Sequence, residues 1–421
     1  MSKAIKIITK ATKQILKGFK SPKKALQKAG ILDVEIPNFR VEKIPIKCIL
    51  RSGESRIPAN QYARLTGNLL RSSQRAIEGP HVKLLEEYLR IGLKVLNKDF
   101  FENTEYYRNA VECISFTGSY FPYVRKNEQI IDVAQGFFEA FEGKRPDKHN
   151  STNGHNAPGD LIEVRAIKNS NCYELVHGNH RVASAFLRGE CKISAKVLLS
   201  ETTTPVQDML FDVLWQSGRV ELYQPVNLPE VAKWPILRQC LDRFNLMKNF
   251  LTALDGPNKT YIDIGSSYGW FVNEFMRFGY ESFGVERDPF AIKIGSEIYG
   301  VPQERFFRSD IVDFLTKSHN TYDIVSCFSV AHHFALGKGS ISVEELIEKL
   351  DKITRHVLFF DTGEAHEAWF KDLLYEWNPD FIEKFLKTHT KFSKIIRLGK
   401  DQDNRGEFIS NYGRTLFACV R

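Results

Sequence analysis

The sequence lacks the features that mark membrane-spanning and disulfide-bonded proteins. No apolar run approaches the roughly 18 residues of a transmembrane helix, and the first lysines do not precede one apolar block as in a secretory signal. The seven cysteines are scattered, odd in number and without a C-x-x-C pair, which fits a reducing cytoplasm. Cys172, His177, His180 and Cys191 are close in sequence, but their spacing matches no usual zinc arrangement. We therefore expect a cytoplasmic protein without a disulfide scaffold or a metal site.

Acidic residues are absent from residues 1–30, which hold nine lysines. Six of these recur at steps of three and four from Lys3 to Lys20, and most apolar residues of the segment lie off that stripe. This pattern predicts a basic amphipathic helix over residues 1–35. Such a helix suits an anionic membrane surface or a polyanion, and docking on its own protein is the alternative. Docking on its own protein stays open, and among external partners the inner face of a membrane is favoured over nucleic acid.

Internal repeats are also absent, and the length of 421 residues suggests two or three domains. We expect an α+β domain over residues 36–204, with a helix at 179–190 and a loop at 145–159, which is dense in Asn, Gly, Pro and His. The strand-like runs of this domain are 41–51, 161–167, 172–178 and 192–199. Residues 205–250 contain four prolines and predict a mostly helical linker.

Residues 251–421 alternate regularly between strand-like and helix-like segments. Helices fill the gaps between the first five strands, which is the pattern of a parallel, doubly wound sheet. The last two strands have no helix between them and predict an antiparallel pair. The expected strands are 260–264, 281–285, 304–308, 322–327, 353–360, 391–397 and 414–420. The predicted fold class is therefore α/β, with a mostly parallel seven-stranded sheet whose last strand is antiparallel.

Polar motifs follow the first three of these strands. Gly265, in "DIGSSYG", allows a sharp turn and a close approach of the backbone to a ligand, and Gly269 opens the next helix, whose free N–H groups favour an anion. Glu286 closes the second strand 21 residues later, where an acid usually accepts the hydroxyls of a ribose. Asp310 ends the third strand, so that it would accept from an adenine amino group while Ile311 supplies apolar contact.

This constellation resembles the class I S-adenosylmethionine-dependent methyltransferases, which have a Rossmann-like sheet, and the likeness covers residues 257–421. Ser267 replaces the middle glycine of the family motif, and a small residue there still permits close approach. A dinucleotide is the competing cofactor, but its G-x-G-x-x-G pattern is absent. The resemblance implies that S-adenosylmethionine is the cofactor. The residues expected to bind it are Asp263, Gly265, Ser266, Ser267, Gly269, Glu286, Asp310, Ile311 and Ser329.

Two histidines follow the fourth strand, in "SVAHHF". Methyl transfer to a hydroxyl acceptor needs a base, and His333 and His332 are the candidates for that catalytic role. The alternative is that they only pack or cap a helix. Glu364, His366 and Trp369 follow the fifth strand and are expected to face the acceptor, unless they only begin a helix with ordinary surface residues.

A second motif lies in the N-terminal half. Gly178 follows a strand and precedes a helix that starts with Asn179, His180 and Arg181, a natural phosphate site. This block resembles the ParB/sulfiredoxin-like superfamily, and Arg51 is near the end of that fold's first strand. The resemblance implies a phosphate- or nucleotide-binding pocket. Asn179 replaces the sulfiredoxin cysteine and His180 with Arg181 replaces the E-R pair of partition proteins, so a structural role and a second enzymatic activity both stay open.

We predict a cytoplasmic methyltransferase whose acceptor is a small molecule or a glycan, at the membrane face. The first alternative is methylation associated with nucleic acid, supported by the ParB likeness and the lysines of residues 1–30. Against it, no N/D-P-P-Y/F motif follows the fourth strand. The second alternative is a regulatory protein that binds S-adenosylmethionine or a nucleotide without turnover.

Overall fold

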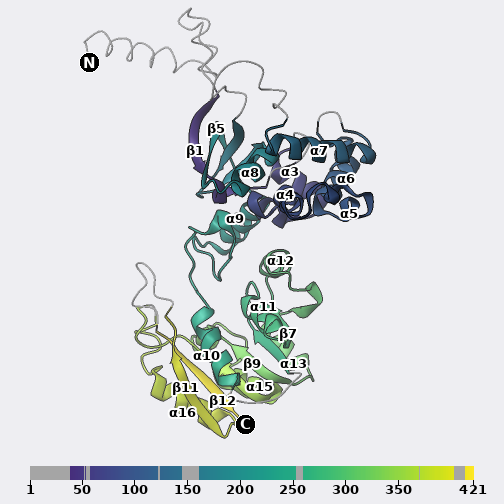
Figure 1. Cartoon of the computed structure of the whole chain (residues 1–421). Helices are drawn as coiled ribbons and strands as arrows, with labels where there is room; N and C mark the ends of the chain where they lie inside the picture. Colours follow the sequence, from purple (N-terminus) through teal and green to yellow (C-terminus); the bar gives the residue numbers. More distant parts are fainter. Residues whose placement is uncertain are drawn as a thin grey trace, which may run out of the picture.

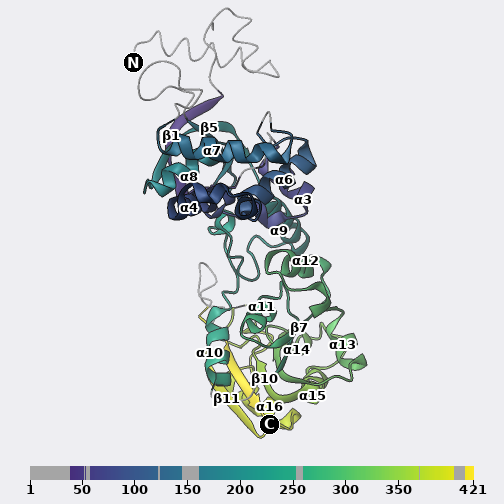
Figure 2. The ribbon, with the colours of Figure 1, turned by 45° about the vertical axis from the view of Figure 1, so that its right-hand side comes forward.

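The computed structural model describes residues 38–51, 53, 57–121, 124–144, 161–252, 259–368, 370–402 and 413–421. The predicted basic helix, the 145–159 loop and Trp369 lie outside these described residues. Figures 1 and 2 show two α/β parts, with α9 between them. Within the described ranges, no helix is long and apolar enough to cross a membrane.

The N-terminal part contains a mixed five-stranded sheet, in the order β1-β5-β3-β4-β2. Pairs β1/β5 and β3/β4 are antiparallel, whereas β3/β5 and β2/β4 are parallel. The strands are β1 (Phe39–Pro45), β2 (Ile49–Leu50), β3 (Ile162–Ile167), β4 (Tyr173–His177) and β5 (Lys192–Thr202). The single strand predicted at 41–51 is wrong, because the 3-10 turn η1 (Ile46–Cys48) splits it and sends its two halves to opposite edges of the sheet.

Helices make up the rest of this part. They are α3 (Ala59–Thr66), α4 (Pro80–Ile91), α5 (Lys98–Glu102), α6 (Glu105–Thr117), α7 (Ile130–Phe141) and α8 (Asn179–Leu187), with 3-10 turns η2 (Leu69–Ser73), η3 (Ala76–Glu78), η4 (Gly92–Leu96) and η5 (Asn127–Gln129). Helix α8 packs on the sheet through Val182 and Ala185 and on the helical core through Ala183. Helix α8 therefore joins the sheet to the helices.

The connecting segment is helical only at its ends, α9 (Pro205–Ser217) and α10 (Leu241–Thr252), with the short turn η6 (Pro229–Val231) between them. Three of the four prolines, Pro225, Pro229 and Pro235, and the absence of a helical period explain why the middle of the predicted helical linker is mostly irregular. Helix α9 buries Leu210 in one cluster with Ile294 of α12 (Pro289–Ile298), so it contacts the C-terminal part. Helix α10 buries Phe244 in the core of the C-terminal sheet.

The C-terminal part contains the seven predicted strands in one sheet, in the order β11-β12-β10-β9-β6-β7-β8. Strand β12 is antiparallel to both of its neighbours, and the pairs from β10 to β8 are parallel, as predicted. The strands are β6 (Thr260–Ile264), β7 (Glu281–Glu286), β8 (Phe306–Arg308), β9 (Tyr322–Cys327), β10 (Thr354–Phe360), β11 (Lys394–Lys400) and β12 (Thr415–Val420).

Alternating strand residues cover both faces of this sheet with apolar side chains. Tyr261 packs with α10 and α11, whereas Ile262 packs in the opposite core with α15 and α16. The remaining helices are α11 (Trp270–Arg277), α13 (Ile311–Lys317), α14 (Ala331–Ala335), α15 (Val343–Ile353) and α16 (Pro379–His389), with the 3-10 turn η7 (Gln303–Arg305). This doubly wound arrangement leaves the carboxyl ends of β6 to β10 at one edge, which is where ligands bind in such sheets.

Candidate active site

The glycine turn lies at the carboxyl end of β6 and has an unusual backbone. Gly265, Ser267 and Gly269 have φ of +82°, +52° and +76°, so three alternate residues are left-handed. A Cβ on Gly265 would be 2.8 Å from Cγ2 of Val330, and one on Gly269 would be 2.6 Å from Cζ of Phe306. Only glycine fits these two positions, whereas Ser267 holds a strained conformation that costs about 1 kcal/mol.

Glu286 lies directly against this turn. Its Oε2 accepts from the N–H of Ser267 at 2.9 Å, and its Oε1 accepts from the N–H groups of Arg287 and Asp288 at 2.8 and 2.9 Å. Burial raises the pKa of Glu286, although the three N–H donors act in the opposite direction. The structure therefore brings the second-strand acid onto the glycine turn, as the spacing predicts.

Asp310 and Ile311 complete the third strand end. Asp310 caps α13 by accepting from the N–H of Val312 at 2.9 Å, and its Oδ2 is 3.9 Å from Nη1 of Arg287. Cδ1 of Ile311 would be 3.5 Å from a Cβ on Gly265, so this side chain reaches the glycine turn. The three predicted strand ends thus converge.

Asp263 and Ser266 are buried beneath the turn. Asp263 Oδ1 accepts from Oγ of Ser326 at 2.6 Å, and burial raises the pKa of Asp263 to about 7. The hydroxyl of Ser266 is directed at the carbonyl of Val285, 3.5 Å away, in β7. Both side chains therefore point into the protein, so they would act on a ligand through the backbone of the turn.

Gln224, in the middle of the connecting segment, holds the turn from outside. Its Nε2 donates to the carbonyl of Ser266 at 3.3 Å, and its Oε1 accepts from the N–H of Trp270 at 3.2 Å. The neighbouring Tyr223 donates its N–H to the hydroxyl of Tyr268 at 3.4 Å. Sequence reasoning missed these residues, because a lone glutamine in an aperiodic, proline-containing segment carries no signal.

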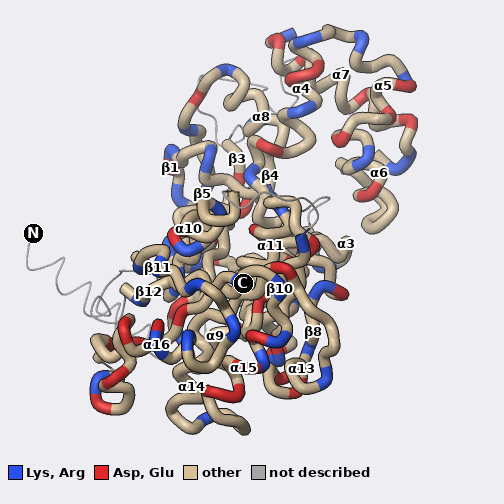
Figure 3. Tube along the Cα trace, turned by 90° about the horizontal axis from the view of Figure 1, so that it is seen from below, with Lys and Arg blue, Asp and Glu red and all other residues tan. Residues whose placement is uncertain are grey.

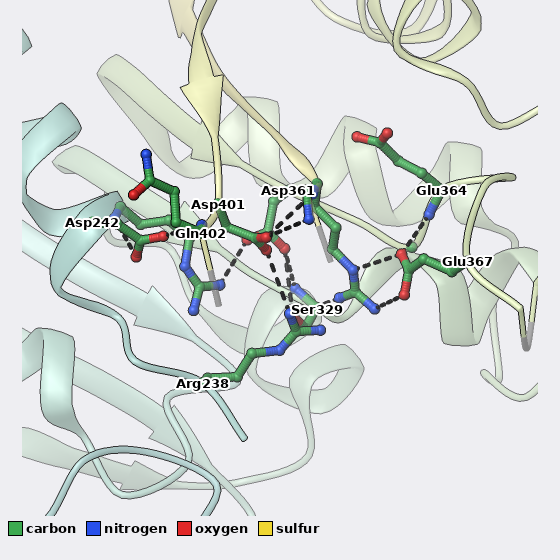
Figure 4. Close-up of polar contacts among 12 residues, drawn as sticks. Arg238, Asp242, Ser329, Asp361, Glu364, Glu367, Asp401 and Gln402 are labelled. Carbon is green, nitrogen blue, oxygen red and sulfur yellow. Dashed lines mark hydrogen bonds and ion pairs between the residues drawn. The ribbon is translucent and has the colours of Figure 1, made fainter. Parts of the chain in front are cut away.

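A buried ionic network joins the loops after β9 and β10 to the start of β12 (Figure 4). Asp361 accepts from the N–H of Ser329 at 2.7 Å and from Nη1 of Arg243 at 2.9 Å. Arg414 donates to the hydroxyl of Ser329 at 2.8 Å and forms a bidentate pair with Glu367 at 2.7 Å. The side chain of Ser329, predicted to bind cofactor, is therefore engaged with Arg414.

Asp401 extends this network. Its Oδ2 is 3.4 Å from Nη1 of Arg238, and its Oδ1 accepts from the N–H of Gly413 at 2.7 Å. Buried charges need partners, and here each carboxylate meets a guanidinium or backbone N–H groups. The network fixes the loop geometry beside the glycine turn, and its partners are too far apart in sequence for a motif to reveal them.

The two histidines after β9 differ sharply in their surroundings. His332 is buried, its Nδ1 accepts from the N–H of Gly363 at 3.2 Å, and burial lowers its pKa to about 2. His333 is exposed, and its pKa is lowered by partial burial and by nearby cations. His332 is therefore buried and held by the loop of Gly363, whereas His333 is accessible. In the following loop, Nδ1 of His366 is 3.3 Å from Oε2 of the buried Glu364.

The N-terminal motif forms a different arrangement from the expected helix-end site. Gly178 has φ of +117°, and a Cβ there would be 2.7 Å from Cγ2 of Ile162. Asn179 begins α8, but Arg181 donates to the carbonyl of Leu161 at 2.8 Å and contacts Nδ1 of His177 at 2.8 Å. The guanidinium of Arg181 is therefore engaged with the residue that precedes β3 and with the end of β4.

His180 and Arg51 instead meet in a cluster that we call the Arg–His cluster, consisting of Arg51, Arg71, His81, Asn109 and His180. Arg51 and Arg71 both donate to Oδ1 of Asn109, at 2.9 and 3.0 Å. The rings of His81 and His180 are 4.8 Å apart, and burial, His180 and Arg51 lower the pKa of His81. Burial lowers the pKa of His180 to about 3. Arg71, His81 and Asn109 were missed, since they belong to helical segments without a motif.

In the part of the chain that the structure describes, no group of three or more His, Cys, Asp or Glu side chains is arranged to hold a metal ion.

Comparison with known proteins locates a family match in the C-terminal part. A family model described as a methyltransferase domain matches residues 239–391. No curated protein matches the chain. Among solved structures, the bifunctional kinase-methyltransferase WbdD is 17% identical with a TM-score of 0.40, covering 50% of this chain and 45% of its own. Magnesium protoporphyrin IX methyltransferase (ChlM) from Synechocystis PCC 6803, solved with bound SAM, is 17% identical with a TM-score of 0.32, covering 43% of this chain and 78% of its own.

The matched segment thus spans less than half of WbdD. The family match does not extend to residues 36–204, where the ParB-like likeness stays a prediction. It includes the glycine turn, Glu286, Asp310 and both histidines of α14. Residues 239–391 therefore match a methyltransferase domain, which confirms the predicted enzyme class and agrees with S-adenosylmethionine as the cofactor, and the acceptor stays a prediction.

Proposed function

We propose that the protein transfers the methyl group of S-adenosylmethionine to a small-molecule or glycan acceptor at the carboxyl edge of the C-terminal sheet. The observation that carries this proposal is the contact between the glycine turn and Glu286. A carboxylate has about four acceptor positions, and three are occupied by N–H groups of Ser267, Arg287 and Asp288, which leaves one for a ribose hydroxyl. Gly265 lets the ligand approach the backbone, and Ile311 lies beside it for an adenine ring.

The residues of this chain would act mainly by positioning the cofactor and the acceptor. When bound, S-adenosylmethionine supplies an electrophilic methyl group for an in-line displacement, a reaction whose rate depends strongly on alignment. Gln224 and the network of Ser329, Asp361 and Arg414 hold the turn and the neighbouring loop in one geometry. For a hydroxyl acceptor, His333 is the side chain that removes the proton, because it is accessible and neutral.

The acceptor would be selected by the parts outside the sheet. We propose a domain division into residues 1–35, 36–204, 205–250 and 251–421, with the third part supplying Gln224 to the site. Residues 361–378 would face the acceptor together with the N-terminal domain, and the lysines of residues 1–30 would bring the protein to an anionic membrane surface. Deleting residues 1–30 should abolish binding to anionic vesicles and leave cofactor binding intact.

A second candidate function is supported by the Arg–His cluster. Two guanidinium groups share one amide oxygen beside two histidines, which is an environment that favours a phosphate group. The N-terminal domain would then bind a nucleotide, or nucleic acid if the methylation acts there. A steep loss of DNA binding with rising salt would support nucleic acid, whereas salt-insensitive binding of a nucleoside triphosphate would support a nucleotide site.

Binding and turnover are tested separately. Calorimetry should show S-adenosylmethionine binding to the wild-type protein and none to Gly265→Arg, whose side chain would fill the turn beside Val330. Transfer of a radioactive methyl group into a cell extract then separates an enzyme from a regulatory protein. Unchanged cofactor binding by Gly265→Arg would refute the assigned pocket, and binding without transfer to any fraction would favour the regulatory alternative.

A further inference from the structure

Three exposed cationic side chains from separate elements lie around His333 and the glycine turn, and we call them the cationic rim. They are Arg219, just after α9, Arg287, at the end of β7, and Lys338, after α14. These elements lie far apart in sequence, so the rim exists only in the folded chain.

Arg219 is fixed beside the glycine turn. Its guanidinium carbon is 4.5 Å from the ring centroid of Tyr223, a favourable cation–π distance. The N–H of Tyr223 is bound by the hydroxyl of Tyr268, and the next residue, Gln224, bonds both ends of the turn. The connecting segment therefore carries a positive charge to the site together with the residues that brace it.

The other two cations flank the proposed base and the second strand end. The N–H of Lys338 donates to the carbonyl of His333 at 2.9 Å, which places the lysine one turn beyond that histidine. Arg287 directly follows Glu286, and its Nη1 is 3.9 Å from Oδ2 of Asp310, with the two side chains 80% and 50% exposed. An ion pair this long and exposed is strongly screened by water, so it leaves Arg287 available.

The acidic groups nearby are bound mainly by backbone N–H groups. Both oxygens of Glu286 accept from backbone N–H groups, and Asp288 caps α12 through the N–H of Phe290 at 2.9 Å. Across the described ranges, no carboxylate lies within ion-pair distance of Arg219 or Lys338. After burial, the groups that lower the pKa of His333 are all cations, namely Lys338, Arg414, Arg219 and Arg287.

The outer helices of the same domain are different. Along α13, α15 and α16, lysines are interspersed with carboxylates (Figure 3), and pairs such as Lys349 with Glu345 at 3.4 Å form within one helix. Lysines of these outer helices therefore meet carboxylates of the same helix, whereas Arg219 and Lys338 have no such ion pair within the described ranges. A positive rim raises the local concentration of anions and binds them through charge-assisted hydrogen bonds.

We propose that the methyl acceptor is an anion, with a phosphate or carboxylate group that Arg219, Lys338 and Arg287 bind while the methylated atom faces the cofactor. This inference rests on the proposed methyltransferase function and names the acceptor class of the same site. A neutral acceptor of the same shape would gain none of these contacts.

The test uses the full-length protein loaded with S-adenosylhomocysteine and three probes of similar size: phenyl phosphate, benzoate and benzyl alcohol. The rim variant is Arg219→Gln/Lys338→Gln, and the matched control is Lys352→Gln/Lys384→Gln, which removes two exposed lysines from α15 and α16. Calorimetry should show the wild-type and control proteins binding phenyl phosphate or benzoate at least about tenfold more tightly than the rim variant. The preferred anion identifies the group.

Equal anion affinity in the rim variant and the wild type would overturn the proposal, and so would a wild-type preference for benzyl alcohol. Affinity for S-adenosylhomocysteine is measured in every variant and should not change. If the wild type fails to bind that nucleoside, the cofactor site is wrong, and the same anion titrations on the unloaded protein still decide whether the rim binds anions.

Discussion

Replacing Gln224 with methionine tests whether the connecting segment is part of the active site. Methionine keeps most of the side-chain volume and removes both hydrogen bonds. The carbonyl of Ser266 keeps another donor, the N–H of Gly269 at 2.9 Å, so losing the hydrogen bond from Gln224 costs about 0.5–1.5 kcal/mol. The N–H of Trp270 opens α11 and would be left buried without a partner, which costs about 1–3 kcal/mol.

The expected total is about 1.5–4.5 kcal/mol, shared between stability and cofactor affinity. Because about 1.4 kcal/mol corresponds to a factor of ten in an equilibrium constant, a loss of half this energy on binding weakens the affinity about threefold to fortyfold. Urea unfolding and calorimetry with S-adenosylhomocysteine measure the two parts. Gln216→Met, at an exposed position of α9, is the matched control and should change neither quantity.

Gln224→Ala extends the comparison, since it adds a small cavity to the same loss of hydrogen bonds. It should be at least as destabilising as Gln224→Met. If Gln224→Met matches the wild type in both stability and affinity, the segment does not brace the glycine turn and the reasoning fails.

Three further changes probe the site. Gly265→Ala places a Cβ 2.8 Å from Val330 and should weaken cofactor binding at least about tenfold by calorimetry, whereas Gly279→Ala, with φ of +94° and no neighbour within 4 Å, should cost only backbone strain of about 1–2 kcal/mol. The pKa of Asp263 is raised to about 7 in the folded state, so the protonated carboxyl stabilises the fold fully below about pH 4, and this stabilisation is lost as the pH rises through 7. Asp263→Asn should flatten the fall of unfolding free energy with pH, as measured by unfolding curves at several pH values. Arg414→Met leaves the buried carboxylate of Glu367 without its guanidinium partner and should cost about 3–5 kcal/mol in urea unfolding, much of it recovered in Arg414→Met/Glu367→Gln; an unaltered single variant would contradict the buried pair.

Much of the C-terminal fold could be predicted from the sequence because its signals are local. Buried parallel strands read as short apolar runs, and turns with special backbone angles require particular residues, as at Gly265 and Gly269. The distance of 21 residues from Gly265 to Glu286 is one helix and one strand, so the chain itself brings the acid to the turn. The N-terminal strand at 41–51 was harder, since an alternating pattern does not reveal the break at Ile46.

The paired histidines show the limit of motif reasoning. Sequence alone makes His332 and His333 nearly equivalent, because both follow β9 in one short helix. Burial separates them, since His332 packs beneath the loop of Gly363 and His333 faces outward. Likewise, Arg51 and His180 were predicted at one phosphate site with Arg181, but Arg181 is engaged with Leu161, and residues from other helices surround the first two.

The sequence by itself determined which functional residues follow the first three strands of the C-terminal sheet: the glycine turn, then Glu286, then Asp310. Only the tertiary structure decided what surrounds that edge. Gln224, Arg219, Arg243 and Arg414 reach the site from segments that are distant along the chain, and their hydrogen bonds and charges carry no periodic or local signal. The backbone angles of a turn depend on the residues of that turn, so the sequence reveals them. A buried ion pair or a cationic rim depends on which distant segments the packed core brings together.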